Sequence, residues 1–81
     1  MIVDLHPIFR DDSAIYRTLR ESLFKANATG VPVIEIIPGK GSGTLKKRVL
    51  AFLAQQHIKR LYARVEAGPS NTGRVYVYLR R

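Results

Sequence analysis

The sequence predicts an α/β fold of the α+β kind, a two-layer sandwich in which two helices cover one face of a four-stranded mixed sheet. Two observations predict it. Apolar residues recur at helical spacing in two segments, and apolar runs or alternating patterns typical of strands occupy four others. The expected order is β-α-β-α-β-β, and right-handed crossovers would place both helices on the same face of the sheet.

The N-terminal part predicts a strand and a helix. Residues 2–6 form a short strand, with Val3 and Leu5 on one face, that Pro7 ends. The candidate helix caps that follow are Asp11, Asp12 and Ser13. The apolar stripe of this helix comprises Ile15, Tyr16, Leu19, Leu23 and Phe24. Gly30 is the expected terminating residue.

The pattern of the rest of the chain predicts a strand, a helix and then two more strands. Residues 31–37 are nearly all apolar, as in a strand buried on both faces. A helix is expected from Thr44 to about Gln56, with Ser42 as its candidate cap. Alternation in residues 59–66 and 74–80 predicts an antiparallel hairpin. The residues expected on its open face are Tyr62, Arg64, Arg74, Tyr76, Tyr78 and Arg80.

Length and composition narrow the class of protein. The 81 residues predict one domain, residues 1–81, and no disulfide or thiolate metal site because cysteine is absent. No stretch approaches the roughly 20 apolar residues of a membrane span, and no signal peptide is visible. We therefore expect a cytoplasmic protein, with no membrane partner and in a monomeric state.

The charge of the chain is strongly asymmetric. Residues 1–36 hold four basic and five acidic side chains, whereas residues 37–81 hold ten basic and one acidic. A basic half predicts a polyanionic partner, with nucleic acid, including ribosomal RNA, as the leading class. A merely basic soluble domain is the alternative.

A glycine-rich loop joins the second strand to the second helix. Gly39, Lys40, Gly41, Ser42 and Gly43 would let the backbone approach an anion at the start of that helix. The lysines in the first helical turn, Lys46 and Lys47, oppose the helix dipole unless an anion lies nearby. The loop matches neither a Walker loop nor the dinucleotide fingerprint, since Thr44 stands at the deciding position of both. A tight strand-to-helix turn is the alternative.

Asp4 and His6 stand two residues apart at the end of the first strand, so they should share a face. Parallel strands would bring them to the same sheet edge as the glycine loop. The pair could perform general acid/base chemistry on a phosphodiester or contact a phosphate. Alternatively, Asp4 caps a turn and His6 is a half-exposed strand end.

The open face of the hairpin interleaves tyrosine with arginine. Such a surface can stack single-stranded bases, with Arg64 and Arg74 contributing charge. Tyrosine also favours strands for packing reasons alone, which leaves the alternative open.

The chain resembles the Smr domain family. VDLH at residues 3–6 is similar to the LDLH signature of that family, and IIPGKGSGTLKKRVLAFL is similar to its HGxG strand-loop-helix signature. The segment VYVYL resembles the closing strand. The resemblance implies a fold similar to the C-terminal domain of translation initiation factor three, with the last strand antiparallel and inserted between its neighbours. It also implies that Asp4 and His6 correspond to the catalytic pair of the family.

Two departures from the family pattern concern the site. Pro38 stands where the loop histidine is usual, and Pro7 stands where a glycine usually follows LDLH. Pro38 removes an imidazole and a backbone donor; if that histidine binds or protonates phosphate, catalysis is weakened while anion binding survives. Some members of the family carry threonine at this position, which keeps hydrolysis open.

The expected function is nucleic-acid binding, with endonuclease activity on DNA or RNA as the activity that the resemblance implies. The alternative is a non-catalytic module that associates with the ribosome or with a protein. The sequence assigns no cofactor, and it leaves a divalent metal ion open. A small-molecule phosphate enzyme is a weaker third option, because so short a chain offers no second lobe.

Overall fold

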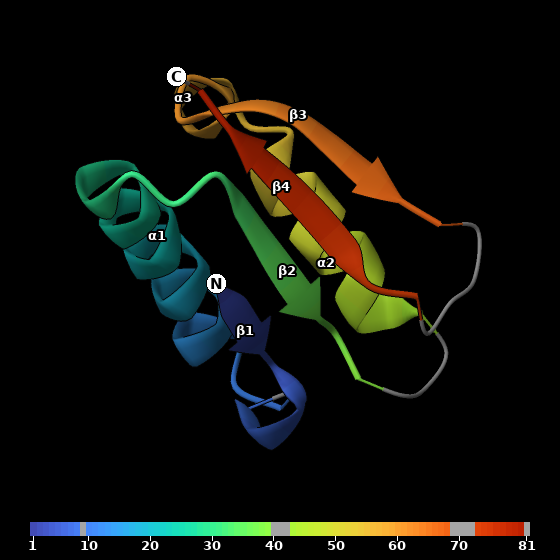
Figure 1. Ribbon diagram of the computed structural model, residues 1–81. Helices are drawn as coiled ribbons and strands as arrows, with labels where there is room; N and C mark the ends of the chain where they lie inside the picture. The colour runs from blue at the N-terminus through green and yellow to red at the C-terminus, as the bar shows by residue number, and fades with distance from the viewer. Residues whose placement is uncertain (9, 40–42, 69–72, 81) are drawn as a thin grey trace.

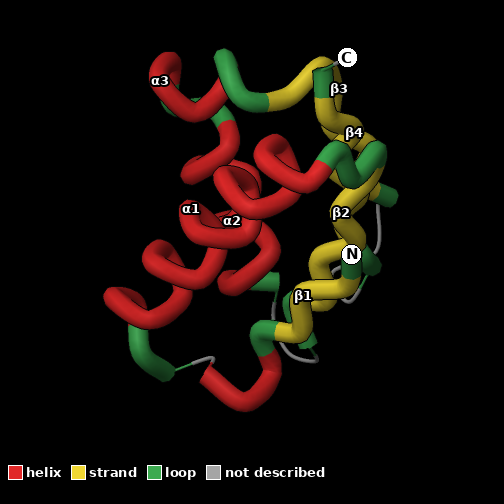
Figure 2. Tube along the Cα trace, turned by 60° about the vertical axis from the view of Figure 1, so that its left-hand side comes forward, coloured by secondary structure: helices red, strands yellow, loops and turns green. Residues whose placement is uncertain are grey.

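Helices and strands alternate along the chain before two final strands, as the sequence predicts. In the computed structural model, four strands form one sheet, and helices gather on one side of it (Figures 1 and 2). The structure describes residues 1–8, 10–39, 43–68 and 73–80. The elements are β1 (Ile2–Asp4), the 3₁₀ helix η1 (His6–Ile8), α1 (Asp12–Thr29), β2 (Val33–Ile37), α2 (Thr44–Leu53), α3 (Gln56–Lys59), β3 (Tyr62–Ala67) and β4 (Val75–Leu79).

The sheet is mixed, and its strand order is β1-β2-β4-β3. β1 pairs with β2 in parallel, whereas β4 pairs antiparallel with both β2 and β3. β4, the last strand in the chain, therefore lies between β2 and β3, as the family resemblance implies. The predicted two-layer α+β architecture is confirmed.

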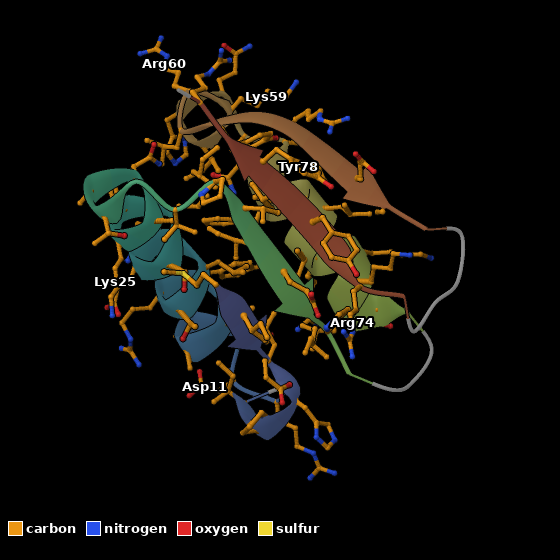
Figure 3. All side chains as sticks on the ribbon, viewed as in Figure 1. Asp11, Lys25, Lys59, Arg60, Arg74 and Tyr78 are labelled. Atoms are coloured by element: carbon orange, nitrogen blue, oxygen red, sulfur yellow. The ribbon has the colours of Figure 1, made fainter. Side chains whose placement is uncertain are left out.

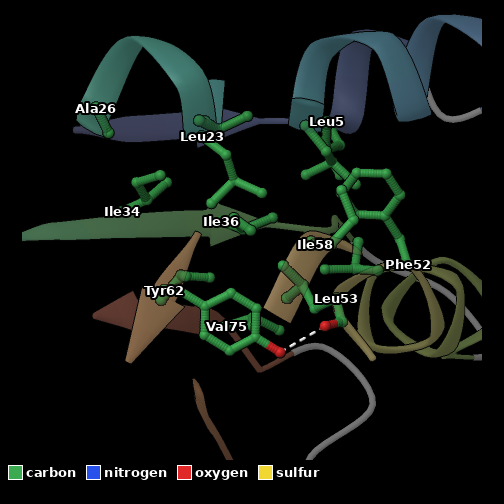
Figure 4. Close-up of a cluster of buried hydrophobic side chains, with 14 of the residues drawn as sticks. Leu5, Leu23, Ala26, Ile34, Ile36, Phe52, Leu53, Ile58, Tyr62 and Val75 are labelled. Atoms are coloured by element: carbon green, nitrogen blue, oxygen red, sulfur yellow. Dashed lines mark hydrogen bonds between the residues drawn. The ribbon is translucent and has the colours of Figure 1, made fainter. Parts of the chain in front are cut away.

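The core lies between the sheet and the helices (Figure 4). Each strand sends alternate side chains into it, because successive residues of a strand point to opposite faces. The buried sheet residues include Val3, Leu5, Ile34, Ile36, Val75, Val77 and Leu79. The helices contribute the buried residues Ile15, Leu19, Leu23, Val49, Phe52, Leu53 and Ile58.

The helix α1 begins at a side-chain cap. The carboxylate of Asp11 accepts the backbone N–H of Ala14 at 3.0 Å, which satisfies one of the donors left unpaired at a helix start. Three of the five residues of the predicted apolar stripe, Ile15, Leu19 and Leu23, are buried. Tyr16 and Phe24 are 36% and 55% exposed, so they lie outside the buried stripe. The ring of Tyr16 stacks on Phe52 of α2, with 5.9 Å between centroids.

The strand β2 is covered on one face, so the prediction of a strand buried on both faces is wrong. Ile34 and Ile36 are buried, but Val33, Glu35 and Ile37 are partly exposed. No described helix covers that second face (Figure 2). The near-continuous apolar sequence predicted burial of both faces because Val33 and Ile37, which lie on the open side, are apolar as well.

The predicted second helix is three residues shorter than expected, and a short helix that the sequence did not predict follows it. α2 ends at Leu53, Gln55 adopts an extended backbone, and α3 begins at Gln56. Ile58 of this short extra helix is 1% exposed and extends the core. Among the described residues, no helix is both long and apolar enough to span a membrane.

The strand β3 contains an irregularity that changes which residues face the core. Tyr62 pairs with Leu79 but Arg64 pairs with Tyr78, so Ala63 is an extra residue. Tyr62 is therefore 8% exposed and faces the helices, whereas the sequence placed it on the open face. Its hydroxyl donates to the backbone carbonyl of Leu53 at 2.5 Å (Figure 4).

We expect Tyr62→Phe to lower the free energy of unfolding by about 1–3 kcal/mol, because the Leu53 carbonyl loses its buried donor. Burial raises the pKa of the Tyr62 hydroxyl above its usual value. The stabilisation that this shift provides is present below the pKa of an unfolded tyrosine, about 10, and is lost as the pH rises above it.

Urea denaturation of both proteins between pH 7 and pH 11 checks this. The wild type should lose more stability above pH 10 than the variant does. Tyr16→Phe is the matched control, because Tyr16 is partly exposed. An equal alkaline loss in Tyr62→Phe and the wild type would contradict the prediction.

Candidate functional site

The carboxyl ends of β1 and β2 form one edge of the sheet. Because the strands are parallel, the chain leaves both at the lower end of the view in Figure 1. The backbone N–H of Leu5 donates to the carbonyl of Ile37 at 2.9 Å, which extends the pairing one step beyond β1. His6 follows the first of these residues directly, and Gly39 lies two residues beyond the second.

The side chain of His6 lies against the backbone of Gly39. A Cβ atom placed on Gly39 would stand 3.3 Å from Cδ2 of His6 and 3.6 Å from its Cβ. Gly39 also has φ of +93°, a conformation that favours glycine. The structure therefore brings together the two segments that topology predicted to converge, and His6 remains exposed to solvent.

Asp4 forms a hydrogen bond with the backbone of His6. Its carboxylate accepts the His6 N–H at 2.9 Å, at the point where the chain leaves β1 and enters η1. The expectation that Asp4 and His6 share a strand face is wrong, because His6 begins the 3₁₀ helix instead of continuing the strand. Asp4 thus stabilises the turn that carries His6, which is the alternative that the sequence left open for it.

The far end of the glycine loop is the start of α2. Gly43 is the N-cap, with φ of +88°, and its carbonyl accepts the N–H of Lys47 at 3.0 Å. The N-cap is therefore Gly43 and not Ser42. Lys40, Gly41 and Ser42 lie outside the described residues, so their predicted part in phosphate binding stays a prediction. A helix start carries partial positive charge, which favours an anion in front of it.

The two lysines of this helical turn differ. Lys46 is 7% exposed, and its ammonium donates to the carbonyl of Gly68, just after β3. Lys47 is exposed. The sequence offered a signal for this difference, since Lys46 lies three residues before Val49 and seven before Leu53, on the buried stripe of the helix. Lys47 is the lysine whose charge faces solvent.

Pro38 enters the loop as a buried residue. It supplies neither an imidazole nor a backbone donor. The chain has two histidines, and the second, His57, belongs to α3 at the opposite end of the sheet (Figure 1). His6 is therefore the imidazole available at this edge.

Arg64 and Arg74 belong to a second surface, the open face of the sheet: Arg64 lies over the ring of Tyr78, and Arg74 is labelled in Figure 3. Arg74 forms an ion pair with Glu35 at 2.5 Å, and Arg64 forms one with Glu66 at 2.9 Å. The guanidinium carbon of Arg64 also lies 4.2 Å from the ring centroid of Tyr78. The residues predicted to bind nucleic acid thus divide between the sheet edge and the sheet face.

The described part of the chain contains no group of three or more His, Asp or Glu side chains arranged to hold a metal ion. The divalent metal considered from the sequence stays a prediction.

The comparison with protein families gives one match. The model of the Smr domain matches residues 3–80, which is nearly the whole chain. The match includes both sides of the His6–Gly39 contact. No curated protein and no solved structure matches the chain. The likeness to translation initiation factor three therefore stays an expectation.

We expect Gly39→Ala to destabilise the protein by about 1–3 kcal/mol, because alanine is strained at this positive φ and its methyl group presses on His6. The ring signals of His6 should shift in the NMR spectrum of the variant. Gly68→Ala is the matched control, since nothing lies within 4 Å of its added Cβ. Its stability should stay within about 0.5 kcal/mol of the wild type. Equal unfolding free energies for the two variants would refute the packing described.

Proposed function

The chain belongs to the Smr domain family, and we propose that it binds nucleic acid at the sheet edge formed by His6, Gly39 and the start of α2. The family is generally nucleic-acid-binding. The observation that carries the proposal is the contact between His6 and Gly39. It joins an exposed imidazole to a glycine backbone that leads into a helix start.

The charges near this edge support an anionic ligand. Lys47 is exposed in the first turn of α2, where its own charge opposes the helix dipole. A phosphate in front of the helix would be attracted by the ammonium of Lys47 and by the partial positive charge of the helix start. The absence of a side chain at position 39 lets His6 pack against this backbone, which holds the imidazole at the edge. The segment after residue 36 contributes ten of the fourteen basic side chains.

We propose phosphodiester cleavage as a second activity, because His6 is exposed beside the proposed phosphate position. An imidazole can accept a proton from an attacking oxygen or donate one to a leaving oxygen. Asp4 would hold His6 in place through the backbone N–H that it accepts. Pro38 argues for binding over cleavage, because the position that usually carries the loop histidine has no proton to transfer.

Several finer expectations remain predictions. They are a preference for RNA or DNA, ribosomal association, cytoplasmic location and the monomeric state. The non-catalytic alternative, a ribosome-associated or protein-interaction module, is favoured if the wild type binds nucleic acid without cutting it.

We expect binding to a short oligonucleotide to weaken steeply with salt, because phosphate contacts release counterions. Lys47→Ala should make the slope of log K against log salt shallower by about 0.7 for a single strand or 0.9 for a duplex. Fluorescence anisotropy measured across a salt series gives both quantities. Lys25→Ala, at an exposed lysine of α1, is the matched control (Figure 3). A flat salt dependence in the wild type would sink the binding proposal.

We expect His6→Ala to abolish any nicking that the wild type shows on plasmid DNA or cleavage of a labelled RNA. The reason is the loss of the imidazole at the sheet edge, which is worth about 100- to 10,000-fold for general acid/base catalysis. His57→Ala should cut like the wild type, and parallel reactions with EDTA test the divalent metal. Undiminished cleavage by His6→Ala would exclude His6 as the catalytic group.

A further inference from the structure

The open face of the sheet presents two tyrosines in its middle. Tyr76 and Tyr78 lie on β4, which is flanked by strands on both sides, and each is partly exposed. The alternate residues of β4 are buried on the helix side. By the alternation of burial along β4, the two tyrosines therefore point away from the core, toward the face that no described helix covers in Figure 2; Tyr78 is labelled in Figure 3.

The spacing of Tyr76 and Tyr78 along the strand suits an extended strand of nucleic acid. Residues two apart on an antiparallel strand are separated by about 6.8 Å, which is twice the 3.4 Å between stacked bases of one strand in a duplex. Bases resting on Tyr76 and on Tyr78 would therefore have to be unstacked from each other. Only an unpaired strand can be stretched in this way and expose its bases to the rings.

The paired charges on this face balance one another, so they do not oppose an anionic chain. The two glutamates of the face, Glu35 and Glu66, are each paired with an arginine, so their repulsion of a phosphate is reduced. The guanidinium of Arg64 lies over the ring of Tyr78, so a base would stack on the guanidinium plane or on the other face of the ring. Arginine in this arrangement contributes to the binding of single-stranded bases.

The face also lies on a line between two basic ends of the molecule. Tyr76 pairs across from Glu35, two residues before the end of β2, so it lies nearer to the His6–Gly39 edge than Tyr78 does. At the opposite end of the sheet, Arg80 follows β4; α3 with Lys59, and Arg60 just after it, lie at the same end but on the helix side (Figures 2 and 3). Glu66 is the single acidic residue after residue 36. A backbone crossing the face would meet cations at both ends.

We propose that the open sheet face holds an unpaired segment of the nucleic acid, with bases stacked on Tyr76 and Tyr78 and the backbone running between the His6–Gly39 edge and the end that carries Arg80. This inference rests on the proposed function, and it narrows the ligand to single-stranded nucleic acid. RNA and DNA share the chemistry that the face recognises.

The test compares 12-nucleotide single strands of RNA and of DNA with blunt duplexes of the same sequence, by fluorescence anisotropy. The wild type should bind a single strand more tightly than its duplex. Tyr76→Leu and Tyr78→Leu should each weaken single-strand binding by about 5- to 150-fold, the range of one lost stacking contact. Duplex binding should change little. The RNA and DNA arms show which strand is preferred.

Two controls separate stacking from folding. Tyr76→Phe keeps the ring and should bind single strands as the wild type does. Phe24→Leu removes an aromatic ring that is 55% exposed on α1, in the helix layer, and should also leave binding unchanged. If the leucine variants do not fold, amide shifts of the wild type on adding the single strand decide the matter. Shifts at Arg64, Tyr76 and Tyr78 are then expected.

Three results would overturn the inference. Unchanged single-strand affinity in both leucine variants, or absent shifts on the face, would do so and leave the face for a protein partner. Tighter binding of duplex than of single strand would do so as well. In each of these cases a steep salt dependence that Lys47→Ala reduces would keep the binding proposal intact. Absence of binding to every oligonucleotide would overturn both.

Discussion

The parallel pairing of β1 with β2 is the constraint on which the site depends. It aligns the carboxyl ends of two strands more than thirty residues apart in sequence, and the Leu5 to Ile37 hydrogen bond at 2.9 Å carries the alignment to the last residue before each loop. The burial of Leu5, 0% exposed, keeps this end of the short strand β1 in the core. His6 meets Gly39 because of that pairing. The edge would have no defined geometry if β1 were not held.

The fold could largely be predicted because it follows from local patterns and the handedness of crossovers. Ile15, Leu19 and Leu23 recur at helical spacing, and the residues of β4 alternate at strand spacing. The spacing of apolar residues therefore predicts the buried face of each of these elements. The insertion of β4 between β2 and β3 is different. It came from the family resemblance, because strand order is set by long-range pairing that no local pattern contains.

What the sequence could not supply depended on tertiary context. The irregularity at Ala63 reverses the side of Tyr62, and it becomes visible only against the register of β4. In the site, topology predicted that His6 and the glycine loop would converge. A turn capped by Asp4 was one of two alternatives that the sequence left open, but that this turn begins at His6 was not predicted, since the strand was expected to continue to that residue. The roles of the remaining site residues stay predictions.

The buried ammonium of Lys46 has a structural consequence. It fastens the first turn of α2 to the carbonyl of Gly68, so the helix start beside the glycine loop and the end of β3 form one unit. Separating them would strip a largely buried charge of a hydrogen bond, a contact worth about 1.5–3 kcal/mol. The helix start and the end of β3 are therefore joined directly by a side-chain contact. The hydrogen bond of Lys46 thus connects the helix start at the sheet edge with the strand β3, which belongs to the open sheet face.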